Sequence, residues 1–90
     1  GLIVLSSCKD YHKDMLEWAN ELPTNSSREQ VKVLAPDYLV IDWENPEQVN
    51  SYIYRYEITK IRGHEDPVQI KFYLEFENST FLKHGWERLE

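Results

Sequence analysis

The sequence has few of the residues that hold small folds together covalently or through metal ions. Its 90 residues include one cysteine, Cys8, which excludes an internal disulfide framework and a structural zinc site built from cysteines. The three glycines form no phosphate-binding loop and no Gly-x-Ser-x-Gly nucleophile elbow. There is no internal repeat and no complete membrane span. A single small domain that depends on its hydrophobic core is therefore expected.

Basic residues are also scarce, with ten Lys and Arg against sixteen Asp and Glu and a net charge of −6. This balance argues against a nucleic-acid binder and against docking on anionic lipid by charge alone. The acidic surplus is concentrated in residues 37–57. It predicts a contact patch for a basic protein partner, or else a merely solvated face. The candidate partner-binding residues are Asp37, Asp42, Glu44 and Glu47.

The hydrophobic content of 41% is typical of a folded domain, and its periodicity predicts two helices first. Residues 10–22 carry an apolar stripe at helical spacing, with Asp10 as the predicted N-cap and Pro23 as the stop. Ser26 and Glu29 have the spacing of a capping box, which predicts a second helix over 27–34 that ends before Pro36.

After Pro36 the apolar period changes to two, which predicts β-strands. Strands are expected over 38–43, 52–59, 68–77 and 80–86, with a tight turn at Asn78-Ser79. The predicted fold class is α+β, in which one or two N-terminal helices pack on a three- to four-stranded antiparallel β-meander. The helices are expected to cover one face of this sheet, lined by Tyr54, Tyr56, Phe72, Leu74 and Phe76.

The first eight residues differ from the rest, because an apolar run and two small residues precede the cysteine. Leu5-Ser6-Ser7-Cys8 resembles a bacterial lipobox, which implies lipidation of Cys8 and a stable membrane anchor. Residues 1–8 are then the remnant of a lipoprotein signal peptide, and residues 9–90 form a single small α+β domain. The alternative is a short strand over Leu2–Leu5 with Cys8 as an ordinary buried residue.

A second resemblance covers residues 26–82. Ser26-Ser27-Arg28-Glu29-Gln30-Val31, followed by Leu34-Ala35-Pro36, is similar to the second-helix region of small outer-membrane lipoproteins of the BamE (SmpA/OmlA) type. The aromatic strand Tyr52-Ile53-Tyr54-Arg55-Tyr56 and the hairpin within 70–82 also resemble that family. The glycine of its Leu-Gly-x-Pro corner is missing here, and the proline stands one residue earlier. The resemblance implies an architecture and no specific activity.

No constellation of catalytic residues is evident. The histidines His12, His64 and His84 lie on a predicted helix, loop and strand end, and none has a helical partner at the spacing of a metal site. No cofactor, metal ion or small-molecule substrate is therefore expected, and the chain is not expected to be an enzyme.

Two functions remain open. The first is a lipid-anchored domain of the bacterial cell envelope, in the outer membrane or at the cell surface, that works through protein contacts. The second is a soluble acidic protein, such as an immunity-type inhibitor of a basic partner. The second reading implies a cytoplasmic location if Leu2–Leu5 is an internal strand.

Overall fold

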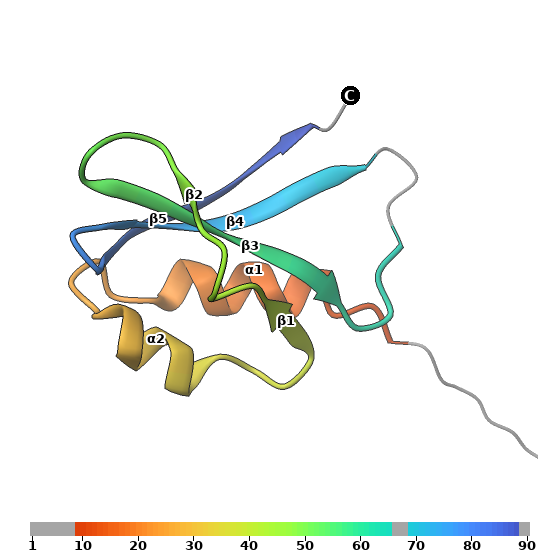
Figure 1. The fold of residues 1–90 in the computed structure, drawn as a ribbon. Coiled ribbons are helices and arrows are strands. Elements are labelled where there is room, and N and C mark those ends of the chain that lie inside the picture. Colours follow the sequence, from red (N-terminus) through yellow and green to blue (C-terminus); the bar gives the residue numbers. More distant parts are fainter. Residues whose placement is uncertain (1–8, 66–68, 89–90) are drawn as a thin grey trace, which may run out of the picture.

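The computed structural model describes residues 9–65 and 69–88, and it confirms the α+β class. Two helices precede an antiparallel sheet in which the strand order is β1-β3-β4-β5 and β2 also pairs with β3. Figure 1 shows both helices on the same side of the sheet. The elements are α1 (His12–Glu21), α2 (Arg28–Leu34), β1 (Leu39–Ile41), β2 (Glu47–Gln48), β3 (Ile53–Ile61), β4 (Ile70–Glu77) and β5 (Thr80–Arg88).

The helix α1 begins one residue later than the predicted N-cap, Asp10, implies. Its N-cap residue is Tyr11, whose side chain makes no capping hydrogen bond. Asp10 still serves the helix end, because its Oδ1 accepts a hydrogen bond from the backbone N–H of His12 at 2.8 Å. Met15 and Ala19 lie one helical turn apart and are both buried, so the apolar face of α1 lies toward the sheet.

The capping box of α2 lies one residue further along the chain than predicted. Ser27 Oγ accepts from the backbone N–H of Gln30, and the Gln30 side chain accepts from the backbone N–H of Ser27. Ser26 is unsuited to this role because it is buried and its carbonyl accepts from the backbone N–H of Phe81 at 2.7 Å. This contact with β5 holds Ser26 outside the helix, so α2 begins at Arg28.

The predicted meander is confirmed as β3, β4 and β5, joined by antiparallel pairing. Asn78 and Ser79 both have positive φ, as a tight turn between right-twisted strands requires. Tyr56 pairs with Leu74 and Tyr54 with Phe76, so these side chains share the face toward the helices. The buried apolar core consists of Met15, Ala19, Leu22, Val31, Leu39, Tyr56, Ile58, Ile61, Leu74, Phe76 and Phe81.

The short strands β1 and β2 lie along the same edge of β3. β1 pairs Leu39 with Ile61, whereas β2 pairs Glu47 with Arg55 nearer the start of β3. The two-residue strand β2 lies outside the strands that the sequence predicts. This arrangement places most of the acidic segment 37–57 at the β1 edge of the sheet.

Candidate protein-docking site on the acidic edge

The candidate site begins where β1 ends. The backbone N–H of Asp42 donates to the carbonyl of Glu57 at 2.9 Å, which ties the turn to β3. Oδ1 of Asp42 then accepts from the backbone N–H groups of Glu44 (3.1 Å) and Asn45 (3.2 Å). An aspartate that bonds the backbone two and three residues ahead stabilises a turn. These hydrogen bonds order the loop backbone, and the side chains of Asp42 and Glu44 line the same surface pocket.

Trp43 connects this loop to the hydrophobic core. Its ring lies 5.2 Å from the Tyr56 ring and 6.1 Å from the Phe76 ring, between centroids, and Tyr56 and Phe76 are both buried. Such tilted and edge-on aromatic pairs stabilise a fixed arrangement of the rings. The exposed part of Trp43 is thus a rigid wall of the site.

These residues surround a surface pocket of about 460 Å³. Val40 lies beside it with 53% of its surface exposed, and the hydroxyl of Thr59 donates to the Val40 carbonyl at 3.1 Å. The pocket is lined by Lys32, Val40, Ile41, Asp42, Trp43, Glu44 and Thr59. Its apolar and aromatic lining with two carboxylates, against one ammonium group, suits the stem and charged end of a basic side chain.

The structure separates the other two predicted partner-binding residues from this pocket. Asp37 lies before β1, with its Oδ1 3.9 Å from the Arg62 guanidinium, in a second and more basic hollow that also contains Lys60. Glu47 forms an ion pair with Lys71 at 3.3 Å on the sheet. Of the four candidates, only Asp42 and Glu44 are brought together.

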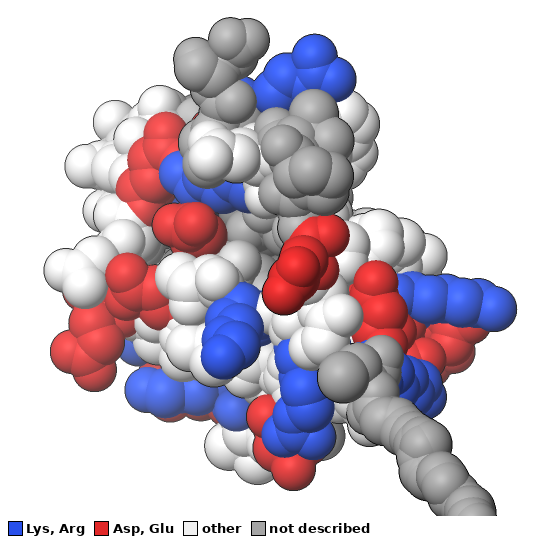
Figure 2. Space-filling view, turned by 90° about the vertical axis from the view of Figure 1, so that its right-hand side faces the viewer, with Lys and Arg blue, Asp and Glu red and all other residues white. Residues whose placement is uncertain are grey.

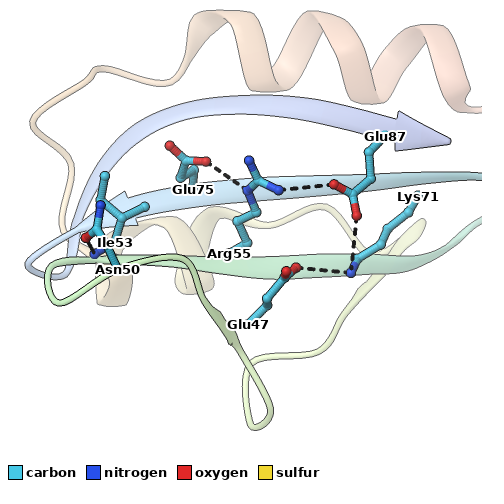
Figure 3. A network of polar contacts seen from close by, with 7 residues as sticks. All are labelled: Glu47, Asn50, Ile53, Arg55, Lys71, Glu75 and Glu87. Atoms are coloured by element: carbon cyan, nitrogen blue, oxygen red, sulfur yellow. Dashed lines mark hydrogen bonds and ion pairs between the residues drawn. The ribbon is translucent and has the colours of Figure 1, made fainter. Parts of the chain in front are cut away.

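A charged network covers the sheet face that points away from the helices (Figure 3). Arg55 donates to Glu75 at 3.0 Å and to Glu87 at 3.1 Å, and it lies over the Tyr73 ring at 4.2 Å. The hydrogen bond that Arg55 donates to Glu75 raises the pKa of Arg55 above its ordinary value. Lys71 extends the network toward Glu87 and Glu47.

This network was not predicted, although a sequence signal for it exists. Arg55, Glu75 and Glu87 all occupy the polar positions of alternating strands, and opposite charges on neighbouring strands favour pairing. Because the guanidinium contacts carboxylates from two strands, the network holds β3, β4 and β5 together. Its charges are largely satisfied within the chain.

A second cluster that the sequence did not reveal joins the start of α1 to the end of β3. The rings of His12 and His64 stack at 4.6 Å, and His64 Nδ1 lies 3.0 Å from an Asp10 oxygen. The hydrogen bond from His64, with that from the His12 backbone, lowers the pKa of Asp10. Gly63 permits this approach for two reasons. Its φ of 74° is a conformation that favours glycine, and a Cβ at this position would clash with the backbone of Lys9 and Asp10.

This cluster does not form a metal centre among the residues that the structure describes. Within residues 9–65 and 69–88, no group of three or more His, Cys, Asp or Glu side chains is placed to hold a metal ion. The third histidine, His84, lies apart from the other two, and its Nε2 contacts Asn20 Oδ1 at 2.8 Å. Burial lowers the pKa of His84.

Charges of both signs share one face of the molecule (Figure 2). On the face that carries the start of α1 and the end of β3, Figure 2 shows acidic and basic side chains interspersed with uncharged ones. Recognition of a basic partner is therefore expected to depend on local carboxylates such as Asp42 and Glu44 rather than on the net charge alone.

Comparison with known proteins found no relative of this chain. No protein-family model, no curated protein and no solved structure matches the chain. Among the described residues, no helix is both long and apolar enough to cross a membrane. Cys8, the predicted lipidation site, and the alternative strand Leu2–Leu5 lie outside the described residues, so the lipobox stays a prediction. The resemblance to BamE-type lipoproteins also stays a prediction, because no family model matches the chain.

Proposed function

We propose that this chain is a lipid-anchored, non-enzymatic domain of the bacterial cell envelope that binds a basic segment of a partner protein. The observation that carries the docking part is the pocket at the end of β1, where Asp42, Glu44 and Trp43 lie beside exposed apolar surface. The anchoring part depends on the sequence Leu5-Ser6-Ser7-Cys8.

The chemistry of the pocket favours arginine as the residue it receives. The aliphatic stem of an arginine would lie on Val40 and Ile41, and its planar guanidinium would reach the two carboxylates beside the Trp43 ring. Charge-assisted hydrogen bonds to carboxylates are about twice as strong as neutral ones. Lys32 also lines the pocket and opposes cations, so the proposed binding depends on the combined charge of Asp42 and Glu44.

The position of bound arginine can be mapped by nuclear magnetic resonance of the isotopically labelled protein. The probe is a capped hexapeptide that contains two adjacent arginines, and the matched control peptide has two glutamates instead. We expect the arginine peptide to shift the backbone signals of residues 40–44 and the Trp43 indole signal. Shifts confined to other elements, or equal shifts from the glutamate peptide, would contradict the proposed pocket.

The anchoring part is tested separately by mass spectrometry of the full-length protein isolated from its host. We expect the mature protein to begin at Cys8 and to carry the mass of two or three acyl chains. A Cys8→Ser variant should lack this added mass and should leave the membrane fraction. A wild-type protein without acyl chains on Cys8 would contradict the anchor.

The second candidate is a soluble acidic inhibitor of a basic protein, which the same pocket would serve. The two candidates differ only in the anchor, because the pocket lies wholly within residues 32–59. A non-acylated protein that binds the arginine peptide at residues 40–44 would favour this second candidate.

A further inference from the structure

The opposite edge of the sheet, formed by β5, presents a long strand with little covering it. Among the described residues, pairing on the outer side of β5 is confined to its start, where Ser27 bridges Thr80 and the backbone N–H of Phe81 donates to the carbonyl of Ser26. From Lys83 to Arg88, no described segment pairs with that outer edge. Figure 1 shows this part of β5 leading to the C-terminus at the margin of the molecule.

The side chains along this open stretch alternate between the two faces of the sheet. Lys83 lies opposite Glu75 and Glu87 opposite Lys71, so both are on the face of the charged network. His84 and Trp86 lie on the face toward the helices. Trp86 is a large apolar side chain at the sheet edge, and 59% of its surface is exposed. An unpaired, exposed edge strand is a template for pairing with another strand.

We infer that two copies of this chain associate by antiparallel pairing of their β5 strands, with the two-fold axis at Gly85. In this register Lys83 of each copy faces Glu87 of the other, so two ion pairs form across the new strand boundary. Trp86 of each copy lies against His84 of the other on the opposite face. Gly85 meets itself at the axis and adds no side chain there, while the Tyr73 ring of each copy lies over its own Gly85.

Neighbouring registers are less favourable. Directly opposed residues of an antiparallel pair have side chains on the same face of the sheet, and within one strand only residues an even number of positions apart share a face. The two-fold axis of a symmetric pair of β5 strands therefore passes through a residue position and not between two residues. Centred on His84, the pairing would place Lys83 against Gly85. Centred on Trp86, it would place Glu87 against Gly85. Both alternatives lose the two Lys83–Glu87 contacts, which makes the Gly85 register the one with matched charges.

The two charges are available for these contacts. Lys83 is exposed, and no ion pair within the described residues includes it. Glu87 uses Oε1 for Arg55, while its Oε2 lies 4.0 Å from Lys71 and can accept from a second ammonium group. The β1 edge offers no equivalent, because it has only three residues and an irregular register.

The association is tested by sedimentation over a concentration series of the wild type and of two charge-reversal variants. Wild type is expected to form dimers, whereas Lys83→Glu and Glu87→Lys each oppose like charges twice in their own dimers. Each variant should weaken dimerisation roughly 10- to 30-fold. An equimolar mixture of the two variants should restore dimers, since opposite charges then face each other at both positions.

The control variant is Lys13→Glu, which reverses an exposed charge on α1 and should leave dimerisation unchanged. Thermal unfolding of each variant separates loss of pairing from loss of folding, which matters most for Glu87 because it contacts Arg55. Should Glu87→Lys fail to fold, Lys83→Glu alone must still weaken the dimer. Monomeric wild type at all concentrations, or a dimer insensitive to Lys83→Glu, would overturn the inference without bearing on the β1 pocket.

Discussion

Leu74→Ala is expected to lower the free energy of unfolding by about 2–5 kcal/mol. Leu74 lies in β4 between β3 and β5, and none of its surface is exposed. Its truncation removes buried apolar atoms and leaves a cavity that the surrounding strands cannot fill without losing their register. Urea denaturation followed by circular dichroism measures the loss as a lower midpoint with an unchanged slope.

Leu34→Ala is the matched control, because it deletes the same atoms from a leucine that is 60% exposed. Leu34 is the last residue of α2, and its truncation is expected to change the free energy of unfolding by only about 0.5 kcal/mol. Equal losses for the two variants would contradict the burial of Leu74 and the exposure of Leu34.

Arg55→Met is expected to lower the free energy of unfolding by about 2–4 kcal/mol. The substitution leaves the Glu75 carboxylate, whose side chain is only 6% exposed, without its guanidinium partner. A buried charge without a partner keeps its full desolvation cost, which is the main source of the expected loss. Because Arg55 is partly exposed, the expected loss of unfolding free energy is smaller than for a fully buried ion pair.

The double variant Arg55→Met/Glu75→Leu separates the lost ion pair from the stranded charge. Replacing both partners by apolar side chains removes the uncompensated carboxylate, so the double variant should be more stable than Arg55→Met alone. Glu47→Gln, at the exposed end of the same network, is expected to cost no more than about 0.5 kcal/mol. A double variant less stable than Arg55→Met would contradict this account of Glu75.

The periodic parts of the fold could be predicted from the sequence. Alternation over 68–77 predicted β4, and the period-two pattern of the aromatic strand predicted β3, because a half-buried sheet imposes that pattern directly. The capping box was placed one residue early, since the sequence offers Ser26 and Ser27 with equal local merit. Only the long-range contact of Ser26 with Phe81 decides between them.

The candidate site was predictable only where its residues are close in sequence. Asp42 and Glu44 are two residues apart on one turn, so their closeness in sequence was enough to predict that they belong to one site. Asp37 and Glu47 belong to the same acidic segment, but β1 and β2 carry them to different cations. The Asp10–His64 contact spans 54 residues, and no local pattern indicates which loop meets the start of α1.

The two proposed interfaces occupy different edges of the sheet. Strand order places the β1 pocket on one side of β3 and the β5 edge on the other side of β4. Pairing through β5 would therefore give a continuous sheet with one pocket at each outer end. A partner with two basic segments of suitable spacing would bind such a dimer more tightly than a single domain.

The most direct test of the docking site compares wild type with Asp42→Asn/Glu44→Gln in a titration with the arginine hexapeptide. Asparagine can still accept the turn hydrogen bonds of Asp42, so the variant removes charge and preserves the loop. The control Glu21→Gln/Glu77→Gln neutralises two exposed carboxylates on other elements. We predict that the Asp42/Glu44 variant loses affinity by at least ~10-fold at low salt, while the control stays within about twofold of wild type. Equal affinity of the Asp42/Glu44 variant and wild type would contradict the proposed site.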